Sequence, residues 1–498
     1  MADVVLVHPK VLNIKSRLVP LPLNLLSISS LLDEEGYKIK IIDQRIKSGW
    51  KELKKKLMKE LKSEPICVGI TSMTGLQILN GLEISKIVKE NSNVPVVWGG
   101  TFPTIMPEIT IENENIDIVC EGEGEITFYE VVKRLEGKKS LSEVRGIWYK
   151  EKKKINRNKK RSFLDLNNIP NIPYHIINLN DYKNCRSSTL NLKEFTINLI
   201  TSRGCPYICT YCYNSIINQG KWRALKSKRV VELLRYLVDK YNIKNFRFDD
   251  DNFFVDQKRV NEIMRGILRE KMDIVMTFQG MRVDTFCKMK KNELDLLYKA
   301  GCRGLAIGME TGSPRILKLL KKGTTIQQTY ATNKRLIEYP EIKSYYNFMT
   351  GIPTETVDDF FMTVNMISKL FKENPNMIIP TIFLFVPIPG TELYNLAIRN
   401  GFVPPNSLTE WGSIDWSQTG DKSFNAQVWL SEKFKKKFKK VALVFLLADL
   451  AKILPDTIPL VNLYSPIAKF RIKNGFYDFM PEKLLFSFMW RVFENKRY

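Results

Sequence analysis

The stretch that decides the fold is "TSRGCPYICTYCYNS", Thr201–Ser215, which places three cysteines within eight residues. These are Cys205, Cys209 and Cys212, spaced C-x3-C-x2-C. Gly204 and Pro206 indicate a turn-rich loop, so three thiols that merely cluster in a core are a poor explanation. The loop directly follows a short apolar run, Phe195–Thr201, which is typical of a buried strand.

Around this loop, short apolar runs alternate with helix-patterned segments such as Lys228–Tyr241 and Val357–Phe371. We expect strands at Phe195–Thr201, Asn245–Phe248, Ile274–Phe278, Gly304–Gly308, Tyr345–Met349 and Ile378–Phe385. Six strand–helix units predict an open, partial (β/α)6 barrel, whose active site lies at the carboxyl ends of its strands. The cysteine loop follows the first of these strands.

A second series of alternations precedes the first. We expect its strands at Asp3–Val7, Lys38–Ile42, Ile66–Ile70, Val94–Trp98 and Ile116–Cys120. Strands of this kind, separated by amphipathic helices, predict a doubly wound, Rossmann-like parallel sheet covered on both faces. The chain is therefore expected to be α/β throughout these two parts.

Ligands of such a sheet bind outside the carboxyl ends of its strands. The small and polar candidates at those ends are Thr71, Ser72, Thr74, Gly99, Gly100, Gly122 and Glu123. Small residues there allow a large ligand to approach the backbone, although glycine-rich turns are also common for purely structural reasons. The first strand is followed by "VHPKVLN" and lacks G-x-G-x-x-G, which argues against a nicotinamide or flavin site.

The sequence predicts four parts. Residues 1–137 form the Rossmann-like domain, 138–192 a basic hairpin and a Pro-rich linker, 193–400 the partial barrel, and 401–498 a mainly helical basic region. In the last part, Ser431–Leu454 repeats apolar residues at spacings of three and four, with lysines on the opposite face. Such a helix either lies on an acidic membrane surface or covers the barrel and its substrate.

Composition restricts the class of protein. The 498 residues carry 77 Lys and Arg against 53 Asp and Glu, a formal net charge of +24. This charge favours an anionic partner, or else a lysine-rich surface without a specific role; we expect no specific nucleic-acid partner. With no signal-peptide pattern and no long apolar run, we expect a cytoplasmic protein, possible contact with the inner membrane surface, and reduced thiols.

Three clustered thiols suit one kind of metal site better than another. A structural zinc ion takes four ligands, and neither His8 nor His175 is near the cysteines in the sequence. A [4Fe–4S] cluster can be held by three thiolates, which leaves one iron open to a further ligand. No cysteine follows Cys302, so we expect a single cluster.

The C-x3-C-x2-C motif, with Tyr211 before its last cysteine, resembles the signature of the radical S-adenosylmethionine (SAM) superfamily. Later segments resemble the same family in order: "FDDDNFF" at 248–254, "FQGMRVD" at 278–284, "IGMETGS" at 307–313, "GIPTET" at 351–356 and "PIPGTELY" at 387–394. The N-terminal part resembles the cobalamin-binding domain of one large subgroup. The resemblance covers about residues 1–400.

The resemblance implies a mechanism and a set of roles. SAM would chelate the open iron, and an electron from the cluster would release a 5′-deoxyadenosyl radical. Tyr211 would lie against the adenine, Glu310 would accept hydrogen bonds from the ribose or amino group, and Gln279 and Arg282 would hold other polar groups of SAM. The electron would come from a donor such as flavodoxin or ferredoxin.

The sequence departs from many cobalamin proteins. It lacks a D-x-H-x-x-G motif, so we expect cobalamin to bind without a lower histidine ligand. Phe102 also stands where relatives commonly carry histidine. Two functions remain open: a cobalamin-dependent methyltransferase acting on an unactivated carbon of a small or lipid-like substrate, or a radical SAM enzyme of cyclisation, coupling or oxidation with cobalamin in another role or absent. A third possibility is a regulatory protein with a redox cluster.

Overall fold

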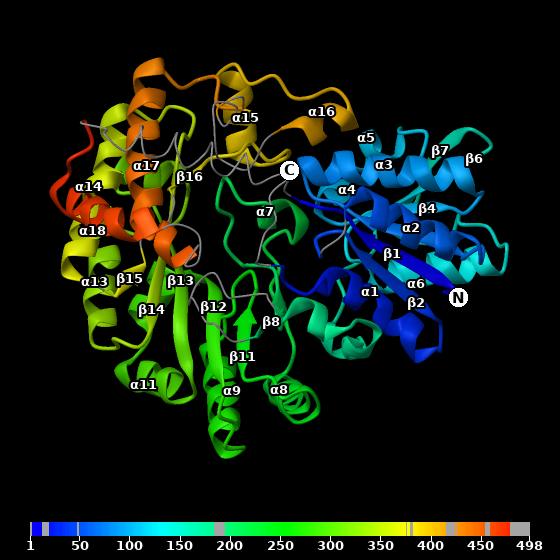
Figure 1. Cartoon of the computed structure of the whole chain (residues 1–498), viewed down its shortest axis with the longest axis horizontal. Coiled ribbons are helices and arrows are strands. Elements are labelled where there is room, and N and C mark those ends of the chain that lie inside the picture. Colours follow the sequence, from blue (N-terminus) through cyan, green and yellow to red (C-terminus); the bar gives the residue numbers. More distant parts are fainter. Residues whose placement is uncertain are drawn as a thin grey trace.

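The computed structural model describes residues 2–11, 19–46, 49–183, 195–374, 376–378, 382–414, 424, 426–453 and 459–478. Over these residues the chain forms two seven-stranded sheets, each covered by helices, and a helical pair near the C-terminal end (Figure 1). The expected α/β class is confirmed, with a Rossmann-like sheet, a curled half-barrel and a mainly helical remainder.

The first sheet has the strand order β2-β1-β3-β4-β5-β6-β7. Its strands are β1 (Val4–His8), β2 (Ile39–Asp43), β3 (Cys67–Thr71), β4 (Val96–Gly99), β5 (Ile118–Cys120), β6 (Ile147–Glu151) and β7 (Lys154–Arg157). The first five pair in parallel, whereas β6 pairs antiparallel with both β5 and β7. The hairpin that we placed with the linker therefore extends the first sheet, because its inner strand hydrogen-bonds along the edge that β5 leaves open.

Helices cover both faces of this sheet, which explains why β1 and β3 are buried along their whole length. They are α1 (Leu23–Glu34), α2 (Trp50–Leu61), α3 (Leu76–Asn91), α4 (Thr101–Ile105), α5 (Pro107–Ile111) and α6 (Gly124–Glu136). Buried residues of α1 and α6 share one apolar cluster, and those of α2 and α3 share another.

The second sheet is parallel throughout, in the order β15-β14-β13-β12-β11-β8, with β16 also pairing with β14. Its strands are β8 (Thr196–Leu199), β11 (Asn245–Phe248), β12 (Val275–Arg282), β13 (Cys302–Glu310), β14 (Lys343–Thr350), β15 (Met377–Ile378) and β16 (Ile382–Leu384). The last expected strand is thus two short ones, on either side of residues 379–381, which lie outside the described residues.

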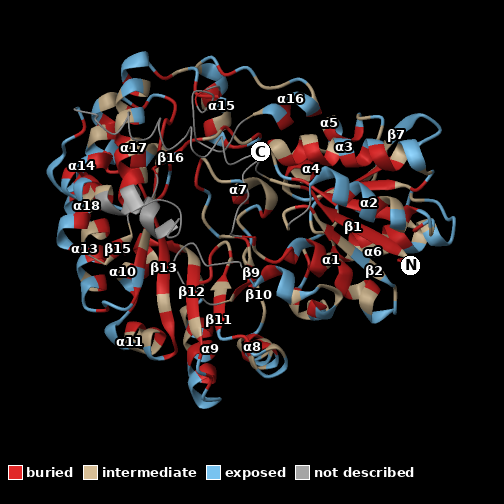
Figure 2. Cartoon of the chain, in the orientation of Figure 1, coloured by how far each residue is buried: buried red, intermediate tan, exposed pale blue. Residues whose placement is uncertain are grey.

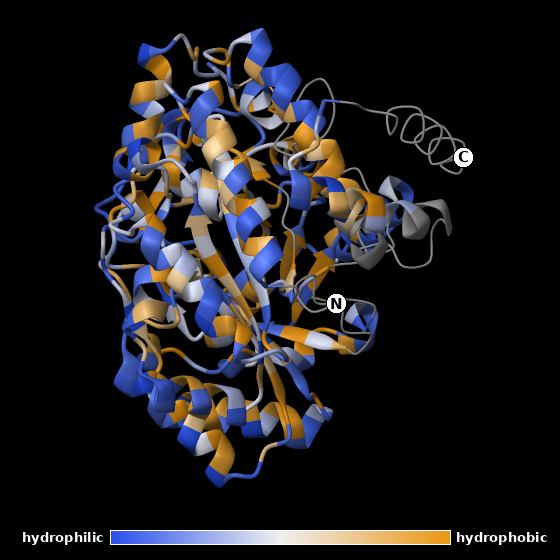
Figure 3. Cartoon of the chain, turned by 90° about the vertical axis from the view of Figure 1, so that its left-hand side faces the viewer, coloured by the Kyte–Doolittle hydropathy of each residue, from blue (hydrophilic) through white to orange (hydrophobic). Residues whose placement is uncertain are grey.

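Helices on the outside of the second sheet include α8 (Ser227–Tyr241), α9 (Gln257–Arg269), α10 (Val283–Lys288), α11 (Lys291–Lys299), α12 (Pro314–Leu319), α13 (Ile326–Ile337) and α14 (Val357–Glu373). Strands and inward helix faces are buried, and the outer helix faces are exposed and mostly hydrophilic (Figures 2 and 3). Three 3-10 turns, at Leu166–Asn168, Tyr174–Ile176 and Leu179–Tyr182, form part of the connection between the two sheets.

The C-terminal region packs against both the first domain and the barrel. Helix α15 (Glu392–Arg399) leads to α16 (Leu408–Ser413), whose Trp411 ring lies 5.7 Å from the ring of Phe102 in the first domain. Helices α17 (Glu432–Ile453) and α18 (Pro459–Asn474) instead pack on α14, with the Phe434 and Phe360 rings 5.3 Å apart. Within the described residues, no helix is both long enough and apolar enough to span a membrane.

Candidate active site

The cysteine loop is flanked by a short two-stranded antiparallel sheet. In it, β9 (Ser202–Arg203) pairs with β10 (Arg223–Ala224). Gly204 follows β9 with a φ of +84°, and a Cβ there would lie 2.0 Å from the carbonyl oxygen of Lys221. No side chain fits that space, so the motif requires glycine at this position. The backbone amide of Gly204 donates to Oδ2 of Asp251 at 2.7 Å.

Two aspartates that follow β11 fix this loop. Asp251 also accepts from the hydroxyl of Tyr213 at 2.8 Å and from Nδ2 of Asn214 at 2.9 Å. Asp250 accepts from the amide and hydroxyl of Thr201 and from the hydroxyl of Ser202. Burial raises the pKa of Asp250 to about 6 despite these bonds. The sequence marked the segment but assigned neither aspartate a role.

The three predicted ligands lie together on this loop. Nδ2 of Asn252 donates to Sγ of Cys205 at 3.6 Å, and Nη1 of Arg282 donates to Sγ of Cys209 at 3.7 Å. Burial, together with the neighbouring Cys209 and Cys205, raises the pKa of Cys212 to about 11, so iron binding must displace protons.

The donor set fits a cluster rather than a single ion. In the described residues, no three His, Cys, Asp or Glu side chains gather closely enough to hold one metal ion. Three thiols on one loop can hold a [4Fe–4S] cluster with one iron left open, whereas a structural zinc ion takes four ligands.

Glu310 lies beside the cysteine loop, close to Tyr211. It is the last residue of β13 and has a φ of +67°, a conformation that is strained for a side chain other than glycine and is concentrated at functional sites. Nζ of Lys322 lies 2.6 Å from its Oε1 and donates to the Tyr211 hydroxyl at 3.4 Å. Burial, then Glu310 and the nearby thiols, raise the pKa of Tyr211 well above its usual value. No sequence pattern had pointed to Lys322.

The two remaining SAM candidates lie on β12. Gln279 sits at the register shift between Phe278 and Met281, where the pairing with β13 is interrupted. Arg282 is buried, donates to Oδ1 of Asp284 at 2.9 Å, and stacks its guanidinium 3.5 Å from the centre of the Tyr207 ring. Arg282 therefore contacts the cysteine loop through the Tyr207 ring and the Cys209 sulfur.

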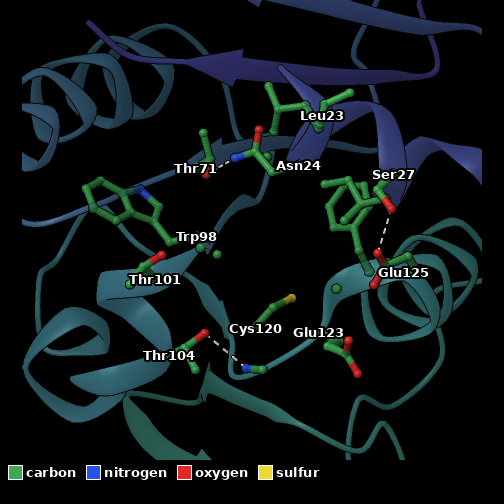
Figure 4. Close-up of a pocket in the computed structure, with 18 of the residues that line it drawn as sticks. Leu23, Asn24, Ser27, Thr71, Trp98, Thr101, Thr104, Cys120, Glu123 and Glu125 are labelled. Atoms are coloured by element: carbon green, nitrogen blue, oxygen red, sulfur yellow. Dashed lines mark hydrogen bonds between the residues drawn. The ribbon is translucent and has the colours of Figure 1, made fainter. Parts of the chain in front are cut away.

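A cavity with about 1200 Å³ of empty space, counting its open mouth, lies at the carboxyl edge of the first sheet (Figure 4). Its walls come from the ends of β3, β4 and β5 and from α1, and barrel residues Ile200, Arg203, Tyr213 and Ile217 close one side. The cavity is therefore shared by the two domains and reaches the cysteine loop.

Most predicted contacts line this cavity: Thr71, Gly99, Gly100, Gly122 and Glu123. Gly100 has a φ of +104°, and a Cβ there would lie 2.8 Å from the carbonyl oxygen of Ser72. Thr71 Oγ1 accepts from Nδ2 of Asn24 at 2.7 Å (Figure 4). Ser72 and Thr74 are not among the lining residues; Ser72 is buried, and its hydroxyl donates to the Met73 carbonyl.

Glu123 and its neighbour Glu125 are bound to the barrel. Glu123 pairs with Nη1 of Arg203 at 2.9 Å and with Nη1 of Arg223 at 2.6 Å, and also accepts from the Leu164 amide. Oε1 of Glu125 pairs with Nη2 of Arg203 and accepts from the Ser27 hydroxyl at 2.6 Å (Figure 4). Oε2 of Glu125, in a side chain that lines the cavity, is buried and has no hydrogen-bond partner among the described residues. Sequence reasoning found neither Arg203 nor Glu125.

These features fit a large ligand rich in hydrogen-bond donors. Cobalamin carries amide side chains, which can donate to the unpartnered Glu125 oxygen, and its tail needs the small residues at the strand ends. None of the described residues that line the cavity is a histidine. His8 is buried elsewhere, beside Gln77, and Phe102 is a core residue that packs against Trp411.

Comparison with known proteins agrees with this geometry. The profile of the radical SAM superfamily matches residues 199–367, and that of the B12 binding domain matches residues 9–132. An uncharacterized methyltransferase of Pyrococcus horikoshii is 32% identical over 397 residues, which cover 79% of this chain and 82% of the relative. The chain belongs to the radical SAM superfamily.

This radical SAM protein has further relatives that match most of its length. The cytidylyl-2-hydroxyethylphosphonate methyltransferase of Streptomyces wedmorensis is 25% identical and covers 77% of this chain and 79% of its own. The cobalamin-dependent SAM radical enzyme OxsB, solved with aqua-cobalamin and SAM, shares the fold: its TM-score is 0.70 at 18% identity, covering 99% of this chain and 75% of that one. TsrM from Kitasatospora setae gives a TM-score of 0.63 at 18% identity, over 81% of this chain and 76% of its own.

Proposed function

We propose that the protein is a cobalamin-dependent radical SAM methyltransferase that acts on an unactivated carbon. The observation that carries the proposal is the shared cavity, in which the carboxyl edge of the first sheet faces the cysteine loop of the barrel. A methyl carrier and a radical source must meet at one substrate, and this arrangement puts both sites on one cavity. Methyltransferases among the relatives support the same reaction class.

We assign each site to residues of this chain. The iron ligands are Cys205, Cys209 and Cys212; the SAM residues are Tyr211, Gln279, Arg282 and Glu310, with Lys322 added; the cobalamin residues are Thr71, Gly99, Gly100, Gly122 and Glu123, with Glu125 added. Ser72 and Thr74 act through the backbone turn that shapes the cavity. When bound, the cluster and SAM supply the radical and cobalamin supplies the methyl group.

The chain's own residues orient and enclose these groups. Glu310 presents a carboxylate at the end of β13 to an amino or hydroxyl group of SAM, and Lys322 holds it there until SAM arrives. Arg282 and Asn252 donate toward two of the thiol sulfurs, which stabilises their anionic form. Arg203 fixes the first domain against the loop, so the two sites keep one separation.

These contacts support a division of the chain into parts. We propose residues 1–137 as the cobalamin domain, completed by the β6–β7 hairpin of the 138–192 segment, and 193–400 as the radical SAM barrel. The 401–498 region acts mainly as a cover. Gln427 Nε2 donates to the Phe385 carbonyl at 2.6 Å, and Trp429 Nε1 donates to the Gly351 carbonyl at 3.0 Å, so this segment lies across the strand ends.

The substrate is proposed to be small or lipid-like. The apolar face of α17 is buried against α14, through Phe434, Phe438 and Val441, and is therefore not available for insertion into a membrane. Contact with an acidic membrane would have to use the lysines of α17 alone. The cover interpretation needs no such contact and accounts for the observed packing.

The test is a product balance under anaerobic conditions. Protein reconstituted with iron, sulfide and hydroxocobalamin is incubated with SAM and dithionite, and both S-adenosylhomocysteine and 5′-deoxyadenosine are measured. Methyl transfer to cobalamin leaves the first product, and radical formation leaves the second. The Cys205→Ala/Cys209→Ala/Cys212→Ala variant should lose 5′-deoxyadenosine while still retaining cobalamin.

The balance also separates the alternatives. Formation of 5′-deoxyadenosine without S-adenosylhomocysteine would reject the methyltransferase and favour a cyclisation, coupling or oxidation enzyme. The anaerobic magnesium-protoporphyrin IX monomethyl ester cyclase of Synechocystis, 24% identical over 64% of this chain and 61% of its own, is a relative of that kind. If neither product formed, a regulatory role for the cluster would be favoured.

A further inference from the structure

A second depression lies on the outer side of the cysteine loop, between α12 and α15. It has about 1110 Å³ of empty space, counting its open mouth. Its lining includes Thr210, Leu319, Leu393 and Leu396 and five charged side chains, which are Arg315, Lys318, Lys321, Glu392 and Arg399. None of these residues lines the cavity described above.

The floor of this depression is the cysteine loop itself. Thr210 lies between Cys209 and Cys212, and its amide donates to the Leu320 carbonyl at 3.1 Å. Its hydroxyl donates to the Leu319 carbonyl at 3.0 Å, and its own carbonyl accepts from the Leu393 amide at 3.0 Å. The end of α12 and the start of α15 therefore hold the loop from outside. Thr210 is one residue from Cys209, a step of about 3.8 Å between Cα atoms.

The rim of the depression is strongly basic. Arg315, Lys318, Lys321 and Arg399 are exposed and stand against a single exposed carboxylate, Glu392. Lys321 pairs with Glu392 at 2.7 Å, and Arg315 pairs with the buried Asp359. Lys318 and Arg399 form no ion pair with any described residue, and both side chains are exposed to solvent.

We propose that this depression is the docking surface for an acidic one-electron donor protein that reduces the cluster. The proposal rests on the proposed function, which requires one electron for each SAM that is cleaved. In the step, the donor is oxidised by one electron, and the cluster is reduced from [4Fe–4S]2+ to [4Fe–4S]1+, without a proton crossing. The SAM residues and the shared cavity, which substrate and cofactors must occupy, contribute no lining residue to this depression.

Two features commit the surface to this partner. A basic rim attracts an acidic protein and orients it before contact, which raises association rates by about 10 to 1,000-fold at low salt. Transfer of the electron over a short distance also requires approach to a thiolate, and here Thr210, the residue next to Cys209 in the loop, lines the depression. A basic patch elsewhere on this positively charged chain would satisfy only the first condition.

The experiment measures reduction of the cluster directly. Reconstituted protein is mixed by stopped flow with reduced flavodoxin, an acidic FMN protein, and bleaching of the cluster absorbance is followed at 50 mM and 500 mM salt. Lys318→Glu/Arg399→Glu should lower the second-order rate at least about tenfold at low salt, and the difference should shrink at high salt because screening shortens the range of both charges.

A matched control reverses the same number of charges elsewhere. Lys299→Glu/Lys334→Glu changes two exposed lysines in the last turns of α11 and α13, at the opposite end of the barrel. It should keep the wild-type rate within about twofold, since neither lysine lines the depression and screening weakens interactions between distant exposed charges. Equal losses in both variants, or no loss in Lys318→Glu/Arg399→Glu, would overturn the proposal.

Dithionite separates this proposal from the proposed function. It is a small reductant that needs no docking surface, so Lys318→Glu/Arg399→Glu should form 5′-deoxyadenosine with dithionite at the wild-type rate. Loss of the dithionite reaction in this variant would mean that the residues act on the cluster or on SAM, and the docking assignment would be wrong. Failure of the wild-type protein with dithionite would instead reject the radical SAM activity itself.

Discussion

Replacing Arg203 by leucine should destabilise the contact between the two domains by an amount that the structure sets. Arg203 bonds to Glu123 and Glu125, but Glu123 keeps its second partner, Arg223, at 2.6 Å. The destabilisation therefore arises mainly at Glu125, whose side chain is only 3% exposed. Without Arg203, Glu125 would retain the Ser27 hydroxyl alone as a side-chain hydrogen-bond partner. Removing one member of a buried pair costs about 3–5 kcal/mol.

The assay is urea denaturation of wild type, Arg203→Leu, Glu125→Gln and the double variant, read at the first transition by circular dichroism. Because the double variant carries no unpaired buried charge, we expect it to recover much of the loss, with a coupling energy of about 2–3 kcal/mol. Arg235→Leu is the matched control. Its pairs with Asp239 and Glu270 are at the surface, so it should cost no more than about 1 kcal/mol.

The pH dependence gives a second, independent readout. Burial alone raises the pKa of Glu125, but Arg203 and Ser27 hold it below its ordinary value of 4.5. In the wild type this carboxylate thus stabilises the fold above pH 4.5 and loses that effect as pH falls through the folded pKa. In Arg203→Leu the lowering effect of Arg203 is lost and burial is opposed mainly by the Ser27 hydroxyl, so the folded pKa of Glu125 rises and the stability deficit relative to wild type should shrink between pH 7 and 5. A deficit below about 1 kcal/mol, or one that is independent of pH, would refute the reasoning.

Four further predictions concern the cofactors and the cover. Anaerobic reconstitution should load about four irons and four sulfides, and the triple alanine variant at Cys205, Cys209 and Cys212 should load none; a full cluster in that variant, or stoichiometric zinc in the native protein, would contradict the site. Glu310→Ala should weaken SAM binding, measured by calorimetry, by about 1–3 kcal/mol, and unchanged affinity would remove Glu310 from the site. Gly99→Leu should abolish retention of hydroxocobalamin on gel filtration and leave SAM binding intact. A Cβ at this position lies 3.8 Å from the Cβ of Cys120, an ordinary contact, and the longer leucine side chain enters the cavity. Equal retention of hydroxocobalamin would show that the cobalamin tail lies elsewhere. Truncation before Ser431 should reduce soluble yield by exposing Phe360 of α14, whereas the intact protein should remain in the supernatant with anionic liposomes at low salt; its sedimentation would restore the membrane interpretation.

The order of the elements could be predicted from the sequence because it depends on local periodicity. Alternating apolar strands and amphipathic helices are set by which residues share a face at spacings of two or of three to four, and both sheets follow that pattern. The same local logic placed the cysteine loop after β8 and Glu310 at the end of β13, since the carboxyl ends of parallel strands meet at one edge.

Only the tertiary structure decided which distant groups meet. Arg203 bonds to Glu125, 78 residues away in the sequence, and Lys322 bonds to Glu310. The hairpin of the 138–192 segment extends the first sheet and is not part of a free linker. Phe102, which the sequence marked as a departure from a ligand position, became a packing partner of Trp411. Such contacts depend on how whole elements pack against one another. The free energy of an ion pair in turn depends on how deeply that packing buries it. A linear pattern fixes which face a residue lies on, but it contains no information on the surface that will cover it.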